Sequence, residues 1–389
     1  MAVSSEVAGS GVLPQTARAP TGSQRLLSLD AFRGATMALM VLVNTAGDGS
    51  HVYGPLRHAE WNGWTPTDVV FPSFLWIVGV AMTLSLAKRL QSGASRAHLL
   101  TQVFRRAAIL YALGLLIYAF PRFDLSTLRL LGVLQRIAIC YLITAAIYLN
   151  TGLRAQVFWI VSLLAGYWII MTLIPVPGYG PGNLDVERNF AHYIDSIVLG
   201  RHNYAATRTW DPEGIVSTLP AIATTLFGVI AGQILRSKRV LSERTTWLFI
   251  AGNALIAIGL FCNLWLPINK KLWTSSFSVF MAGLDSVIFA MFVWAADELG
   301  YRKVFRPFAI MGMNAIAVYM ASELLDEIFG SIRWGRGATA VSLREWLYRS
   351  LFAPLASPID ASLLYAIAYT ALMFLIAWGM YRGKWFLRV

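Results

Sequence analysis

Charged residues are scarce in this sequence. Asp, Glu, Lys and Arg make up only 13% of its 389 residues, whereas 57% are hydrophobic, and the mean hydropathy is +0.59. Such a composition excludes a soluble globular domain, because repeated long apolar runs are typical of a chain that crosses a membrane many times. The expected fold class is therefore all-α, a polytopic membrane helical bundle.

Cysteine is also nearly absent. Cys140 and Cys262 both fall inside apolar runs and neither has a CxxC neighbour, so we expect no disulfide framework and no structural zinc. The sequence has no P-loop, no HExxH motif and no GxGxxG after a strand. These absences count against nucleotide hydrolysis, zinc proteolysis and dinucleotide chemistry, and we expect no metal cofactor.

Acidic residues are outnumbered by basic ones, 20 against 32, which gives a net charge of +12. The basic residues lie in short loops between apolar runs, as membrane orientation predicts, so nucleic acid is not an expected partner. The lipid bilayer is an expected partner.

A span needs about 20 apolar residues to cross the hydrocarbon core. The sequence has ten such runs, at about residues 29–48, 67–87, 99–120, 127–149, 155–175, 215–236, 245–266, 273–296, 306–328 and 360–381. Lys and Arg cluster in the second, sixth and eighth loops and after the last run, so the positive-inside rule predicts that both termini are cytoplasmic.

Three further segments stand outside this pattern. Residues 1–24 lack the apolar stretch of a signal peptide and are expected to form a disordered cytoplasmic tail. Residues 176–214 form the longest outward loop, and 342–356 are expected to be a helix on the outer interface.

A polar block before the second span contains the leading candidates for chemistry. His58, Asn62 and Asp68 lie beside a helix start, where an ionisable group is costly to keep. An imidazole can accept a proton near neutral pH, although His58 could equally be an ordinary loop histidine. Thr65-Pro66-Thr67-Asp68 has the form of a helix start, so Asp68 caps a helix, orients His58, or does both.

Other polar residues have two readings each. Asn44, in the first span, joins helices or donates to His58 or a developing oxyanion. Arg136, inside the fourth span, pairs internally or meets an anionic ligand. Asp211 is the N-cap of the sixth span, or Asp211 and Glu213 together hold a cationic amino sugar.

Six polar segments in the same order resemble the heparan-α-glucosaminide N-acetyltransferase family. They are residues 28–34, 58–63 (His-Ala-Glu-Trp-Asn-Gly, followed by Asp68), 132–136, 211–214, 267–273 and 312–314. The resemblance runs from about residue 25 to the C-terminus. It implies a membrane enzyme that moves acetyl from acetyl-CoA to an amino sugar, with the histidine of the 58–63 block catalytic and the asparagine of the preceding helix also involved.

Carried onto this chain, the resemblance makes residues 25–389 a single transmembrane acetyltransferase domain. The expected sites follow from it: His58, Asn44 and Asp68 in catalysis; Arg105, Arg106, Arg129, Arg136, Lys271 and Asn314 near acetyl-CoA; and Asp211, Glu213, Trp61 and Asn62 near the acceptor. His58 would act as general base, with an acetyl-His58 intermediate as the alternative.

The large outward N-terminal domain and extra first span of the family's animal enzyme are not seen in this sequence. We therefore expect a bacterial inner-membrane enzyme whose acceptor differs from heparan sulfate, with a homodimer left open. Two rivals remain at this point. A secondary transporter of a sugar or organic anion would carry similar intramembrane polar residues, and a non-enzymatic scaffold would use them for packing alone.

Overall fold

The structure is a computed structural model that describes residues 26–335 and 340–387, so the tail predicted at 1–24 lies outside the described residues. Its helices are α1 (Leu27–Asn44), α2 (Val70–Gln91), α3 (Arg96–Ala119), α4 (Val133–Asn150), α5 (Leu153–Leu173), α6 (Phe190–Val198), α7 (Thr218–Leu235), α8 (Leu241–Cys262), α9 (Ser275–Phe292), α10 (Arg302–Met313), α11 (Ala315–Ser331), α12 (Leu343–Leu347) and α13 (Pro358–Arg382). The described chain also has two short antiparallel strands, β1 (Arg333–Trp334) and β2 (Val341–Ser342), and five short helical segments, at Gly54–Leu56, Pro66–Val69, Gly200–His202, Val293–Glu298 and Tyr348–Phe352.

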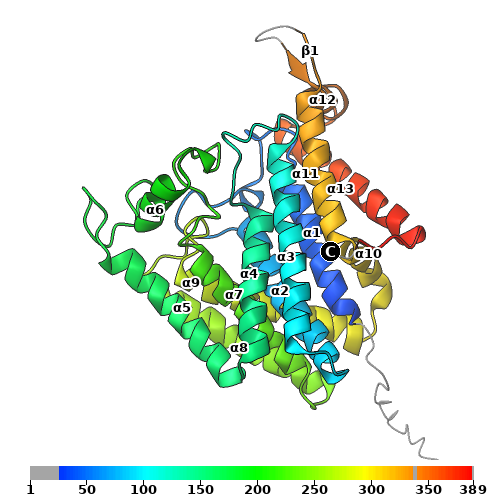
Figure 1. The fold of residues 1–389 in the computed structure, drawn as a ribbon. Helices are drawn as coiled ribbons and strands as arrows, with labels where there is room; N and C mark the ends of the chain where they lie inside the picture. The colour runs from blue at the N-terminus through cyan, green and yellow to red at the C-terminus, as the bar shows by residue number, and fades with distance from the viewer. Residues whose placement is uncertain (1–25, 336–339, 388–389) are drawn as a thin grey trace, which may run out of the picture.

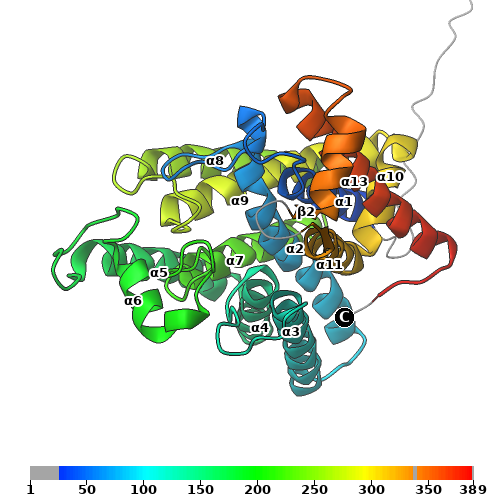
Figure 2. The same cartoon turned by 90° about the horizontal axis from the view of Figure 1, so that it is seen from above.

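The predicted helical bundle is confirmed. Within the described residues, nine helices are long and apolar enough to cross a membrane, and α10 with α11 counts as a tenth span if the bent pair is taken together. Figures 1 and 2 show these helices side by side, with the long loop that carries α6 and the segment around α12 at one end of the bundle.

The sequence predicted one continuous span for the ninth apolar run, but the structure divides this run into two helices. Its two halves, α10 and α11, meet at Asn314 with a bend of 69°. There the Asn314 side chain donates to the Trp385 carbonyl at 3.1 Å and accepts the Leu387 N–H at 3.1 Å. The break is stabilised by the chain's C-terminal segment, which runs back from α13 to the α10–α11 bend.

Glycines allow α1 and α10 to approach each other backbone to backbone. A Cβ on Gly34 of α1 would lie 1.7 Å from the Phe308 carbonyl oxygen of α10, and one on Gly312 would lie 1.9 Å from the Asp30 carbonyl oxygen. Small residues are the usual means of close packing between helices in a bilayer. The contact holds α10 flat against the first half of α1.

The predicted outer helix at 342–356 is present in a shorter form. It comprises α12, followed by a wider helical turn over Tyr348–Phe352. The Ser342 side chain caps it by accepting the Glu345 N–H.

Candidate functional site

A buried carboxylate holds His58 in place. The His58 Nδ1 lies 2.7 Å from Oδ1 of Asp68, whose side chain is only 1% exposed. The other oxygen, Oδ2, accepts the backbone N–H groups of Ala59 and Thr65 at 3.0 Å each. Thr65 also completes the capping box of the turn that leads into α2. Asp68 therefore does both things its sequence allowed: it caps a helix and orients the imidazole.

Lys270 completes this cluster from the loop before α9. Its Nζ lies 3.3 Å from Asp68 Oδ1 and 3.1 Å from His58 Nδ1. Burial lowers the pKa of the Lys270 ammonium, and the charge of Asp68 opposes that effect. A carboxylate can only accept, so the shorter contact to Asp68 requires a proton on His58 Nδ1. That tautomer leaves the Nε2 lone pair free to act as a base or a nucleophile.

Two loops that are about 200 residues apart in the chain form this face. Gly63 donates its N–H to the Ile268 carbonyl at 2.7 Å, and the Asn269 side chain donates to Asn62 at 3.2 Å. Lys271 donates to the Glu60 carbonyl at 2.5 Å, with its ammonium 5.9 Å from the centre of the Trp61 ring. Trp61 and Asn62, which are predicted to bind the acceptor, lie in the loop that carries His58, and the contacts from Asn269 and Lys271 hold this loop in place.

A second charged cluster lies at the same end of the bundle. Arg129 donates to both oxygens of Asp211, at 2.7 and 2.6 Å, and also to Glu213 and to the Tyr118 hydroxyl. Burial alone would lower the pKa of the Arg129 guanidinium, but the hydrogen bonds to Asp211 and the charge of Glu213 raise it above its usual value. The expectation that Asp211 is an N-cap is wrong, because α7 begins at Thr218 with Ser217 before it.

Arg136 is buried beneath this cluster. It donates to the Gly214 carbonyl at 3.0 Å and to the Ser217 hydroxyl at 2.5 Å, and its guanidinium lies 5.1 Å from the Trp273 ring centre. Arg136 therefore pairs internally through one nitrogen, while its buried Nε and Nη1 have no hydrogen-bond partner among the described residues, so the reading as an anion ligand stays a prediction beside internal pairing. The role near acetyl-CoA stays a prediction for Arg129, Arg136 and Lys271, and none of the three lines the cavity described next.

A cavity of about 410 Å³ runs between α1, α2, α3, α4 and the α10–α11 bend. Arg33, Met37 and Met40 of α1 line it at helical spacing, and Asn44 continues that stripe one turn further. On α11, Tyr319 lines the cavity and Glu323 follows one turn later. Asn44 and Glu323 therefore lie beyond the end of the cavity that Met40 and Tyr319 form.

The other end of the cavity is basic. Arg33, Arg89 and Arg106 line it, and Arg106 lies 5.1 Å from the centre of the Tyr141 ring. Arg105, its neighbour in sequence, is exposed and does not line the cavity. Phe386 and Leu387 of the C-terminal segment do, and Asn314, which binds that segment, is flanked by two lining residues.

Sequence reasoning missed four residues of this arrangement: Lys270, Glu323, Arg33 and Arg89. Lys270 stood in a noted polar break, and Glu323 was an acid inside an apolar run, which is itself a signal of function. Arg33 and Arg89 were not singled out from the sequence as donor-binding residues. For metals, the described residues contain no cluster of three His, Cys, Asp or Glu that could hold an ion.

The helical spans define an integral membrane protein, with a polar face at one end of the bundle and a cavity between its helices whose far end is basic. A family model described as heparan-alpha-glucosaminide N-acetyltransferase, catalytic, matches residues 25–266. The chain belongs to this family.

Two curated relatives carry the name heparan-alpha-glucosaminide N-acetyltransferase. The human protein is 31% identical and the mouse protein 29% identical, each over 97% of this chain. The alignment covers 62% of each relative's own length, so this chain spans less than two thirds of the proteins it matches.

Proposed function

We propose that this protein is a transmembrane acetyltransferase that moves acetyl from cytoplasmic acetyl-CoA to the amine of a glucosamine-type sugar on the opposite side of the membrane. The observation that carries the proposal is the His58 imidazole, whose Nδ1 is held by buried Asp68 and whose Nε2 is left free. The names of the two curated relatives support the choice of acetyl transfer to an amino sugar.

The cavity supplies a route for the donor. Acetyl-CoA carries phosphates at one end and the thioester at the other, and Arg33, Arg89 and Arg106 offer cations at only one end of the cavity. The pantetheine arm would then follow the apolar middle, where Met37, Met40 and Phe74 line the walls. The thioester would arrive beside Asn44, at the end that faces the acceptor.

The reaction follows from this placement. The acceptor's neutral amine attacks the thioester carbon, a C–N bond forms, and the C–S bond breaks. His58 Nε2 takes the proton from the amine nitrogen, and the CoA thiolate leaves and is protonated. Asp68 holds the reactive tautomer, and the Asn44 amide donates to the carbonyl oxygen as negative charge develops there.

A two-step path uses the same residues. In it, His58 Nε2 first attacks the thioester, and acetyl-His58 then passes its acetyl group to the amine. Rapid quenching with labelled acetyl-CoA and no acceptor distinguishes the two paths, because only the second one leaves label on His58.

The acceptor face offers anionic and aromatic groups. Glu213 lies at the Arg129 cluster and Trp61 packs edge-on against Trp210 with ring centres 5.8 Å apart. Aromatic rings stack on sugars, and carboxylates attract an ammonium. We place the predicted acceptor residues Trp61, Asn62, Asp211 and Glu213 around this face.

The proposal includes the membrane and the orientation of the protein. Residues 25–389 act as one transmembrane domain in a bacterial inner membrane, with both termini cytoplasmic. A reporter fused to the C-terminus tests this orientation, and an outward C-terminus would refute it. The mass of the protein in native lipid discs will show whether two copies associate.

The test of the function is direct. Purified full-length protein is incubated with radiolabelled acetyl-CoA and a panel of amino sugars, with glucose as the matched sugar that lacks an amine. We expect label on glucosamine and none on glucose. Uptake of sugar into proteoliposomes without consumption of acetyl-CoA would favour the transporter instead.

A further inference from the structure

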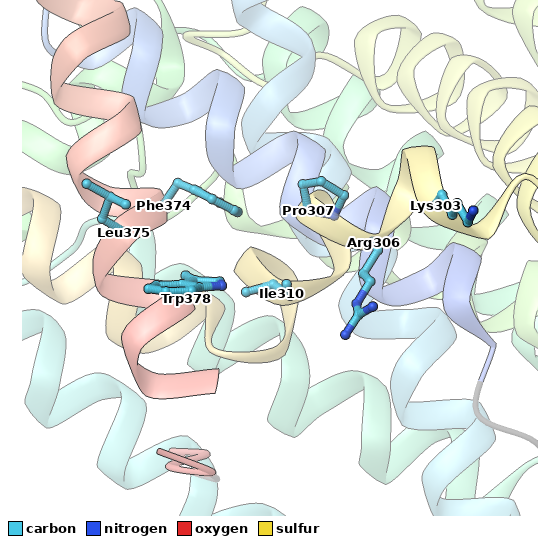
Figure 3. A pocket seen from close by; sticks show the side chains of 7 residues that line it. All are labelled: Lys303, Arg306, Pro307, Ile310, Phe374, Leu375 and Trp378. Carbon is cyan, nitrogen blue, oxygen red and sulfur yellow. The ribbon is translucent and has the colours of Figure 1, made fainter. Parts of the chain in front are cut away.

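A groove on the lipid-facing side of the bundle lies apart from the proposed site. It runs between α10 and α13, has a volume of about 350 Å³, and is lined by Lys303, Arg306, Pro307, Ile310, Phe374 and Trp378, with Leu375 at its edge. Figure 3 shows the basic side chains on α10 and the large apolar side chains of α13 facing α10 across the groove.

The groove is exposed although its walls are mainly apolar. Leu375 is 57% exposed and Trp378 42% exposed, while Ile310 at its floor is buried. In a membrane-spanning bundle such a surface faces acyl chains and not water. An apolar channel between two helices is a place where one acyl chain can lie.

The positive charge at one end of the groove has no protein partner. Lys303 and Arg306 are one helical turn apart, and among the residues that the structure describes neither makes a hydrogen bond or an ion pair. The α10 sequence contains no acidic residue, and the one acid of α13, Asp360, lies at that helix's opposite end. Arg382 adds a third cation, 4.9 Å from the Trp378 ring centre.

The two features together specify a ligand with a phosphate and a long apolar tail. Lys303 and Arg306 follow the turn between α9 and α10, in the loop whose basic residues predict the cytoplasmic face. Basic residues and Trp at that depth meet the headgroup layer, and basic grooves between helices on the cytoplasmic side recognise anionic lipids.

We propose that the groove between α10 and α13 binds an anionic phospholipid. The phosphate lies between Lys303 and Arg306, and one acyl chain lies along Ile310, Phe374 and Trp378. A bound lipid would brace α10, which packs against α1 through Gly34 and so forms one wall of the cavity assigned to the donor.

The test uses the full-length protein in nanodiscs and a photoreactive phosphatidylglycerol with a diazirine in one acyl chain. We expect crosslinks on peptides of α10 and α13, and little labelling by the matching phosphatidylcholine probe. K303Q/R306Q should lose about 10-fold of this labelling, because two cations at the headgroup are removed. The charge-preserving K303R/R306K variant should keep it.

The matched control is R154Q/K238Q, which removes the same net charge from two exposed cations outside the groove. It should label as the unchanged protein does. Equal labelling by the two lipid probes, equal loss in the control, or displacement of the probe by excess inorganic phosphate would each overturn the proposal. Size-exclusion profiles check that every variant is folded before labelling.

Discussion

His58 and His51 lie in one loop and look alike at short range. Each holds its Nδ1 2.7 Å from an aspartate, His58 from Asp68 and His51 from Asp48. The difference is burial, since the Asp68 side chain is 1% exposed and the Asp48 side chain 31% exposed. A carboxylate fixed by backbone N–H groups holds one tautomer, whereas an exposed one exchanges with water.

This contrast gives the first prediction. His58→Ala should lose about 10²–10⁴ in acetyl-transfer rate, because it removes the base or nucleophile. His51→Ala is the control and should stay within about twofold of the unchanged protein. Single-turnover transfer from labelled acetyl-CoA is the measurement, with CoA binding as the check of folding. Equal loss in both variants would contradict the assignment.

Asn44 is the second residue to test. Asn44→Ala should lower kcat by about 10²–10³ if the amide donates to the developing oxyanion, while the Kd of CoA stays unchanged. The control is Asn253→Ala, because Asn253 also lies in a span and its side chain bonds, within the described part of the chain, only to the Phe249 carbonyl of its own helix. A weaker CoA affinity with unchanged kcat would move Asn44 from the reaction to donor binding.

The residue scale also shows what a sequence can and cannot provide. The pairing of His58 with Asp68 could be predicted from the sequence. Asp68 lies at the N3 position of a recognisable helix start, where one carboxylate oxygen caps the helix and the other can bind the imidazole. The contact of Lys270 with His58 could not be predicted, because the two residues are 212 positions apart. They meet where the two loops pair through Gly63 and Ile268. The acidic partners of Arg129, 82 and 84 residues away, could not be predicted for the same reason.

At the scale of elements, the α1–α10 contact depends on two glycines. Gly34→Ala should destabilise the bundle by about 1–3 kcal/mol or more, because the new methyl group would meet the Phe308 carbonyl and neither backbone can move aside. Gly330→Ala in α11 meets no atom within 4 Å and should be neutral or slightly stabilising. Thermal unfolding in detergent measures both, and an unchanged midpoint for Gly34→Ala would refute the close crossing.

A carboxyl group anchors the long loop between α5 and α7, and its titration makes that anchor depend on pH. Asp195 of α6 accepts the N–H groups of Ile215 and Asp211, and burial raises its pKa to about 6. The folded state therefore binds this proton more tightly than the unfolded chain, in which aspartate titrates near 4. The contribution of Asp195 to stability must fall as the pH rises from about 4 to about 6, by up to about 3 kcal/mol.

Asp195→Asn imitates the protonated acid and should remove that fall. Melting temperatures of the two proteins should converge near pH 4 and separate in favour of the variant as the pH rises. Asp185→Asn, at an exposed acid of the same loop, should show no such separation. A pH-independent difference between Asp195→Asn and the unchanged protein would contradict the assigned shift.

The boundaries of the helices, like the contacts of single residues, could be predicted only where local sequence decides them. The apolar runs predicted where helices lie, since hydropathy alone decides that. They did not predict the break at Asn314, because the groups that satisfy it belong to Trp385 and Leu387, more than 70 residues away. The fourth run was expected from 127 but begins at Val133, since the preceding residues turn outward so that Arg129 reaches Asp211.

At the scale of the whole molecule, a polar face and a basic cavity mouth lie at opposite ends of one bundle. His58, Asn44 and the Arg129 cluster belong to one end, and Arg33, Arg89 and Arg106 to the other. Composition and loop charge predicted a membrane bundle with two unlike sides. The cavity could not be predicted, because it is lined by residues of several helices that come together only in the folded protein.

The most direct measurement of the central claim uses sealed proteoliposomes with acetyl-CoA outside and glucosamine trapped inside. We predict N-acetylglucosamine in the interior, little product when both substrates are outside, and about 10²–10⁴-fold less with His58→Ala. Product that forms only when both substrates share one side, or transfer by folded His58→Ala at the unchanged rate, would contradict acetyl transfer across the membrane through His58.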